Sequence, residues 1–391
     1  MVLAHARHAN SLRGELLAKV ASLEDVLRAD IPESQAARTL APRSVAALRE
    51  AGLFTLKLPR ELGGLEPDPM TQVEVIEAVS YIDASLGWNV CIGNGGISLT
   101  AFCSNEAIET MFKDGRIPTM AGVFKPVRGA LVPGGLRVSG RWSWASGIRH
   151  AEWVAAHVLL DAGDGQPPLS RIAVMPIDDV TIHDNWQVTG LQGTGSCDFS
   201  TQDLFVADAY TFDLRKLEPQ RGGPFFHMGL PGLLINEFMG LYFGVARRAL
   251  DEMLALIKSK QRGYGKPSSV ADRGVVQRAI GEGDLKLRAV RALAMEILQD
   301  VWATVCRGAA PSMEQQVDMR SVTVLAAETA VDIAAKAVRY GGGQAIFLDH
   351  ALQRCLRDLD TAAVHLLVSD IAYEQRGQLL LGREVLDPLA G

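Results

Sequence analysis

Residues 339–367, RYGGGQAIFLDHALQRCLRDLDTAAVHLL, gather several groups that can do chemistry. The glycines Gly341 to Gly343 are typical of a helix end, and Asp349 is expected to cap the next helix. His365 follows Asp358 by seven residues, so a helix would present both side chains on one face. Histidine ionises near neutral pH and can give or take a proton. Arg354 and Arg357, which lie between Asp349 and Asp358, suit either ion pairs between helices or ligand binding.

Two other segments suit a flat, conjugated ring. In GRWSWASG, Trp142, Trp144 and Ser146 alternate, so a strand would place all three on one face. Aromatic rings beside a hydroxyl can pack on such a ring and bond its polar edge, although a simple barrel core gives the same pattern. In GLQGTGS, the glycines allow a tight turn that presents backbone N–H groups and the hydroxyls of Thr194 and Ser196.

The sequence lacks the motifs of several common enzyme classes. We find no Rossmann or P-loop phosphate loop, no H-E-x-x-H and no G-x-S-x-G. The eight histidines show no metal-ligand spacing, and the five cysteines contain no C-x-x-C pair. We therefore expect no metal site and no disulfide framework.

Composition narrows the class of protein. The net charge is −6 and the basic residues are scattered, which argues against nucleic-acid binding. No apolar run reaches the ~18 residues that span a bilayer. The first residues, MVLAHARHAN, lack the apolar core of a signal peptide. Together these features predict a cytoplasmic enzyme that does not bind a membrane.

The elements that would position these groups form three blocks. Apolar spacing of three and four predicts helices first, short runs separated by turns then predict strands, and four long amphipathic helices follow. The predicted fold is α+β and mainly α. It has an N-terminal helical domain over 1–117, a β-barrel middle domain over 118–225 and a C-terminal four-helix bundle over 226–391.

In this order, the segments resemble the acyl-CoA dehydrogenase superfamily over nearly the whole chain. LPRELGG, GRWSWASG, TGLQGTGSCDFSTQDLFVAD and the fourteen-position spacing from Gly343 to Arg357 carry the resemblance. It implies that same fold, a homotetramer and a flavin, either FMN or FAD. The flavin-binding residues expected from the motifs and the resemblance are Trp144, Ser146, Thr194, Ser196, Arg262, Tyr264, Arg339, Gly342 and Gly343.

The usual dehydrogenase base is missing. Many family members carry a glutamate eight residues after the aspartate of Arg-Asp, and that position here is Leu366. A leucine cannot accept a proton. Glu237, on the first predicted bundle helix, lies about one turn from the base position of some other members. It remains the alternative base of an FAD-dependent acyl-CoA dehydrogenase.

RDLDTAAVH and GRWSWASG resemble instead the group D flavin-dependent monooxygenases of the same superfamily. These are oxygenase components that receive reduced flavin from a separate reductase. The resemblance implies a monooxygenase that acts on a small organic substrate, with His365 in the active site and an apolar bundle that excludes water. A non-catalytic flavin- or acyl-binding protein is a third interpretation.

Overall fold

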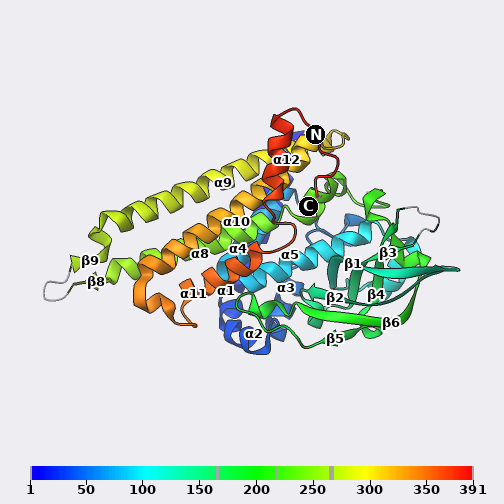
Figure 1. Cartoon of the computed structure of the whole chain (residues 1–391), viewed down its shortest axis with the longest axis horizontal. Coiled ribbons are helices and arrows are strands. Elements are labelled where there is room, and N and C mark those ends of the chain that lie inside the picture. Colours follow the sequence, from blue (N-terminus) through cyan, green and yellow to red (C-terminus); the bar gives the residue numbers. More distant parts are fainter. Residues whose placement is uncertain (1, 162, 164–166, 217, 264–267, 390–391) are drawn as a thin grey trace. The chain divides into compact units, whose positions relative to one another are not determined.

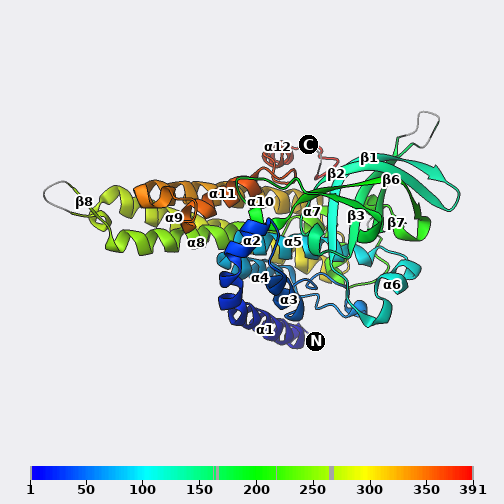
Figure 2. The same ribbon diagram turned by 90° about the horizontal axis from the view of Figure 1, so that it is seen from below.

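The computed structural model describes residues 2–161, 163, 167–216, 218–263 and 268–389. These residues form two compact units, each made of several stretches of chain. The first unit comprises Met1–Asp68, Trp88–Gln187 and Gln192–Gly229. The second comprises Pro69–Gly87, Val188–Leu191 and Leu230–Gly391. Figures 1 and 2 show the chain in two views.

The first unit begins with helices and continues into a sheet. Its helices are α1 (Val2–Ala29), α2 (Ile31–Ala37), α3 (Pro42–Glu50), the part of α5 (Ala84–Ser98) from Trp88 onward, and α6 (Asn105–Met111). Local signals set several ends. The Ser104 hydroxyl accepts the Ala107 N–H at the start of α6, and Pro42 occupies the first turn of α3.

One seven-stranded sheet carries the functional segments of this unit. Its strands are β1 (Met120–Val132), β2 (Gly135–Ala145), β3 (Trp153–Leu160), β4 (Leu169–Pro176), β5 (Thr181–His183), β6 (Cys197–Ala207) and β7 (Thr211–Phe212). The strand order is β5-β6-β2-β1-β3-β4-β7, and β1 and β3 run parallel. Trp142 and Phe199 stack in its core, with ring centroids 5.0 Å apart. The short turns η4 (Ile148–His150) and η6 (Gln192–Thr194) adjoin this sheet.

The second unit is almost entirely helical. Its helices are α4 (Pro69–Ile82), α7 (Gly229–Leu234), α8 (Phe238–Ser259), α9 (Gly274–Cys306), α10 (Met313–Gly341), α11 (Ala351–Ala363) and α12 (Ile371–Leu380), and a short hairpin pairs β8 (Gln261–Arg262) with β9 (Ser268–Ser269). The long helices α8, α9 and α10 lie side by side in both views (Figures 1 and 2).

Glycines let α8 approach α4 closely. A Cβ on Gly240 would lie 2.4 Å from the Val73 carbonyl oxygen, and one on Gly244 would lie 2.2 Å from that of Glu77. Either contact is far below van der Waals distance, so only glycine fits here. The backbones therefore pack directly against each other, and α4 becomes part of the helical bundle.

The glycine turn ends α10 as predicted, but the cap of α11 differs from the prediction. Gly342 has a φ of 65° directly after α10. Asp349 does not cap α11, because the helix starts at Ala351 and the N-cap position is therefore His350. The Nδ1 atom of His350 accepts the Leu352 N–H at 3.1 Å. Asp349 lies one residue too early for its short side chain to cap this helix.

The predicted fold class is confirmed: helices precede a sheet, and further helices follow it. None of the described helices combines the length and the apolar character that crossing a membrane requires. Within the same described residues, no group of three or more His, Cys, Asp or Glu is arranged to hold a metal ion.

Candidate functional site

Three of the predicted hydroxyls form a buried hydrogen-bonded chain in the first unit. Ser146 Oγ lies 2.7 Å from Ser196 Oγ, which lies 2.7 Å from Thr194 Oγ1. We call these three residues the hydroxyl chain. The indole Nε1–H of Trp88 donates to Ser146 Oγ at 2.8 Å. The Gly147 N–H donates to the Thr194 carbonyl at 2.9 Å, which fixes the two turns to each other.

The hydroxyl chain leaves one bonding position at Ser146. A serine hydroxyl donates one hydrogen bond and accepts two. Trp88 fills one acceptor position, and Ser196 fills a second position as donor or acceptor. When Ser196 donates, the hydrogen of Ser146 remains for a ligand. When Ser146 donates, a lone pair remains. Either arrangement suits the polar edge of a heteroaromatic ring.

Trp144 departs from the predicted alternation. Trp142 is fully buried, whereas Trp144 is 65% exposed. The pairing of β2 with β6 shifts register between Trp142 and Ala145, and Trp144 has a φ of 71°. Such a bulge turns a side chain to the other face. The prediction that Trp142, Trp144 and Ser146 share one face is therefore wrong, although Trp144 gains an accessible ring.

The left-handed backbone conformation of Trp144 is strained, and hydrogen bonds from neighbouring residues hold it in place. Residues other than glycine rarely adopt a positive φ, and the cost is about 1–3 kcal/mol. The Ser146 N–H donates to the Trp144 carbonyl at 3.0 Å, and the Asp198 carboxylate accepts the Trp144 backbone N–H. Arg141 holds that carboxylate at 2.8 Å. Strain of this kind is concentrated at ligand sites, so the exposed ring of Trp144 is a candidate binding surface.

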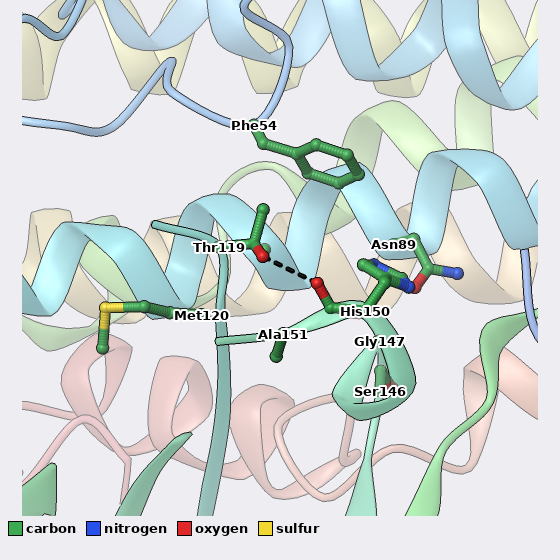
Figure 3. Close-up of a pocket in the computed structure, with 9 residues that line it drawn as sticks. Phe54, Asn89, Thr119, Met120, Ser146, Gly147, His150 and Ala151 are labelled. Carbon is green, nitrogen blue, oxygen red and sulfur yellow. Dashed lines mark hydrogen bonds between the residues drawn. The ribbon is translucent and has the colours of Figure 1, made fainter. Parts of the chain in front are cut away.

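A small cavity borders the Ser146–Gly147 turn (Figure 3). Its volume is about 10 Å³, which is room for about one water molecule and far too little for a cofactor or substrate. A Cβ on Gly147, which has a φ of 73°, would lie 3.0 Å from both Asn89 Oδ1 and His150 Nε2. Thr119 Oγ1 donates to the His150 carbonyl at 2.7 Å. The cavity thus supports the turn and is not itself the active site.

Burial keeps His150 neutral. Desolvation, followed by the positive charge of Arg49, lowers its pKa to about 4. Its ring also packs on Phe54, with centroids 5.8 Å apart. These surroundings fit a structural role for His150.

In the second unit, His365 lies just beyond the end of α11. The helix ends at Ala363, so His365 does not continue the helix face of Asp358 as the spacing predicted. The Tyr242 hydroxyl donates to the Ala362 carbonyl at 3.0 Å and holds this helix end. The edge of the Phe238 ring meets the His365 ring at 5.0 Å between centroids. His365 is half-buried in this setting.

These contacts define the protonation state of His365. Desolvation lowers its pKa to about 4, below the neutral range that the sequence alone suggested. The Leu367 N–H donates to His365 Nδ1 at 3.3 Å, so Nδ1 carries no proton. In the neutral ring the proton is on Nε2. His365 is therefore arranged to donate a hydrogen bond from Nε2 at neutral pH, and its Nδ1 is not available as a base.

The alternative base is far less accessible. Glu237 directly precedes α8 and is 2% exposed, in the break that separates α7 from α8. A carboxylate that removes a substrate proton must reach the substrate. The surroundings of Glu237 therefore favour a structural role.

Arg357 and Asp358 of α11 contact the loop at Gly190 and Leu191 and hold it in place. Leu191 N–H donates to Asp358 Oδ1 at 2.6 Å, and a Cβ on Gly190 would lie 2.0 Å from the Arg357 carbonyl oxygen. Burial, together with the nearby charge of Asp83, raises the pKa of Asp358. The Arg354 guanidinium lies 3.4 Å from Asp83. The sequence left open whether Arg354 and Arg357 form ion pairs or bind a ligand, and the structure shows an ion pair for Arg354.

The remaining predicted flavin-binding residues are on the surface of the second unit. Arg262 in β8, Arg339 in the last turn of α10 and Gly343 are exposed, and Gly342 is half-buried. Tyr264 lies outside the described residues. The role of all these residues in flavin binding stays a prediction.

Trp88 is a contributor to the site that was not among the predicted residues. This residue donates to the Ser146 hydroxyl although it lies 58 positions earlier in the chain. It sits in the apolar run SLGWNVCIGNGG, where a tryptophan suits an ordinary core position. No local pattern could have paired its N–H with a hydroxyl on a distant strand.

Comparison with known proteins identifies the family. The family described as "Acyl-CoA dehydrogenase, N-terminal domain" matches residues 16–113, and "Acyl-CoA dehydrogenase, C-terminal domain" matches residues 238–370. Indole-3-acetate monooxygenase of Pseudomonas putida is 28% identical over 92% of this chain and 92% of its own length. The oxygenase component of an FADH2-dependent resorcinol hydroxylase of a Rhizobium species is 25% identical over 94% of each chain.

A solved structure has the same fold. XiaF from a Streptomyces species, in complex with FADH2 and glycerol, superimposes with a TM-score of 0.92 over 99% of each chain, at 22% identity. The two family matches cover helices that precede and follow the sheet in the sequence. The two relatives cover the sheet as well. The chain belongs to the acyl-CoA dehydrogenase superfamily, and the relatives that it resembles over nearly its whole length are monooxygenases and hydroxylases of that superfamily.

Proposed function

We propose that this protein is the oxygenase component of a two-component flavin-dependent monooxygenase. It takes reduced FMN or FAD from a separate flavin reductase and inserts one oxygen atom into a small aromatic molecule. Both full-length relatives described above are named for oxygenation of small aromatic compounds, which supports this substrate class. The reduced flavin, when bound, supplies the chemistry that activates dioxygen.

One observation carries the proposal: the geometry around residues 365 and 366. Leu366 occupies the position of the dehydrogenase base and cannot accept a proton. Beside it, His365 is half-buried and is arranged to donate from Nε2. The other possible base, Glu237, is only 2% exposed. These side chains favour oxygenation over removal of a substrate proton by a carboxylate.

The residues of the first unit fit a flat ring with a polar edge. Trp144 offers an exposed aromatic face, and Ser146 has one bonding position left beside it. We assign these two residues to the flavin ring, with Thr194 and Ser196 fixing the direction of the Ser146 hydroxyl. His365 would hold an oxygen atom of the substrate or cofactor by donating from Nε2. Apolar neighbours such as Phe238 would exclude water.

We further propose a cytoplasmic homotetramer built through the C-terminal helices. The basis is the family resemblance together with exposed apolar side chains before and after α11, namely Ile346, Phe347, Leu348, Val364 and Leu366. Each of these is more than 60% exposed, and large exposed apolar side chains of this number are typical of an interaction surface. Sedimentation as a monomer at micromolar concentration would contradict this assembly.

The decisive experiment supplies chemically reduced flavin to the purified protein under anaerobic conditions, then adds oxygen and a panel of aromatic compounds. A monooxygenase should form a hydroxylated product that carries one atom from labelled dioxygen. Acyl-CoA thioesters with an artificial electron acceptor serve as the comparison. Oxidation of an acyl-CoA, without oxygenation of any aromatic compound, would establish the dehydrogenase instead.

A further inference from the structure

Lys125 lies against the exposed ring of Trp144. Its Nζ atom is 5.4 Å from the centroid of the indole ring, which is within the range of a cation–π contact. Both residues sit at irregular positions in adjacent strands. The pairing of β1 with β3 shifts register between Val123 and Val127, and that of β2 with β6 shifts between Trp142 and Ala145. Two bulges therefore bring a cation onto a strained, accessible ring.

The charge of Lys125 has no acidic partner among the residues that the structure describes. No carboxylate within this part of the chain forms an ion pair with Lys125. The Asp198 carboxylate accepts the Trp144 backbone N–H but is bound by Arg141 at 2.8 Å. Lys125 is itself exposed, so its positive charge remains available to a ligand on Trp144. An anionic ligand would gain most from such a charge.

Flavin changes charge when it is reduced. The oxidised ring is neutral, whereas the two-electron-reduced ring readily loses its N1 proton near neutral pH and becomes an anion. A cation beside the ring therefore stabilises the reduced state more than the oxidised state. Tuning a flavin by a charge placed near its ring is an established role of protein side chains.

We infer that Lys125, held on Trp144, places a positive charge beside the flavin ring and makes the site prefer reduced over oxidised flavin. This inference rests on the proposed function, because it takes the Trp144 ring as the flavin contact. The preference suits an oxygenase component, which must capture reduced flavin and let oxidised flavin leave. A permanently bound redox cofactor would not need it.

Binding of both redox states to the same variants tests the inference. Dissociation constants for reduced and oxidised FMN and FAD are measured anaerobically at low salt. In Lys125→Met, the ratio of the oxidised to the reduced constant should fall about three- to tenfold, the scale of one partly screened charge. Lys125→Arg keeps the charge and should keep the ratio. Lys113→Met, an exposed lysine of the same unit, is the matched control and should change nothing.

The other outcomes separate the possible explanations. Equal weakening of both redox states in Lys125→Met would mean that Lys125 binds the flavin phosphate, and would overturn the inference. An unchanged ratio with normal binding would overturn it as well and leave the proposed function standing. A wild-type protein that binds neither redox state would overturn the proposed function, and this inference with it. High salt should compress the wild-type ratio toward that of Lys125→Met.

Discussion

The edge of the Phe238 ring faces the ring of His365, with 5.0 Å between centroids and 87° between planes. Phe238 opens α8, and His365 follows the end of α11, so two helix ends create this contact. Burial of the His365 ring lowers its pKa to about 4. The contact thus contributes to the burial of the His365 ring.

Replacing His365 should uncouple oxygen consumption from product formation. Without the Nε2 donor, His365→Ala should bind flavin nearly normally but form at least tenfold less product and release peroxide instead. Glu237→Gln should change yield little. Both yields are measured per folded, flavin-bound protein, because either change also affects packing. Normal yield in His365→Ala with an inactive Glu237→Gln would support the dehydrogenase.

Opening the packing around His365 should raise its pKa. In Phe238→Ala, water reaches the ring, the desolvation penalty falls, and the pKa should move from about 4 back toward 6.5. Titration of the imidazole signals by NMR measures this directly. Phe243→Ala removes another buried phenylalanine from α8 and serves as the control. Equal pKa values in the two variants would show that Phe238 is not the source of the shift.

The order of the elements could be predicted because it depends on local periodicity. Helices, then strands, then long amphipathic helices each have a pattern that is visible within a short window. The proximity of the Thr194 and Ser196 hydroxyls in the GLQGTGS segment could also be predicted, since these residues are only two positions apart. His350 in place of Asp349 shows how a one-residue shift of a helix start changes its cap.

The side-chain directions could not be predicted, because they depend on partners far along the chain. Trp144 leaves the face of Trp142 because of how β2 pairs with β6, about 55 residues away. Trp88 meets Ser146 only after α5 packs on the sheet. His365 does not lie on the helix face of Asp358 because α11 ends at Ala363. The sequence DTAAVHLL contains no glycine or proline that would predict this helix end.

The two neutral histidines should make the protein sensitive to mild acid. His150 and His365 have pKa values of about 4 in the folded state, against 6.5 ordinarily. Between these pH values the unfolded chain binds more protons than the folded protein. The contribution of the two histidines to the free energy of unfolding is therefore fully present above pH 6.5. It is lost as the pH falls toward 4, by up to ~3 kcal/mol for each ring. Denaturant unfolding from pH 7.5 to 4 measures the slope.

His150→Phe isolates one of these contributions. Asp358, whose pKa is raised, acts in the opposite direction and gains stability as the pH falls, so only a difference between proteins is informative. The variant should unfold with a shallower pH dependence than the wild type between pH 6.5 and 4. If the free energies of unfolding of the wild type and of His150→Phe change in parallel with pH, His150 does not contribute to the acid sensitivity.

Removing the Ser146 hydroxyl should weaken flavin binding. Ser146→Ala loses a ring-edge hydrogen bond, and a net contribution of about 0.5–1.5 kcal/mol corresponds to roughly two- to tenfold in affinity. Ser139→Ala, on the same strand but bonded to the Asp203 N–H, is the matched control. Fluorescence titration with reduced and oxidised flavin measures both. Unchanged affinity and flavin spectrum in Ser146→Ala and in Trp144→Ala would remove these residues from the site.

Gly190→Ala should disturb the loop that Asp358 holds. The new Cβ would lie 2.0 Å from the Arg357 carbonyl oxygen, and backbone atoms must move apart to accept it. The Leu191 N–H would then shift from Asp358, whose buried carboxyl depends on that bond. We expect a loss of about 2 kcal/mol or more in unfolding free energy, as for other strongly overpacked sites. Gly343→Ala, where no atom lies within 4 Å of the new Cβ, should cost little. If the two variants unfold at the same denaturant concentration, the loop does not depend on this close approach.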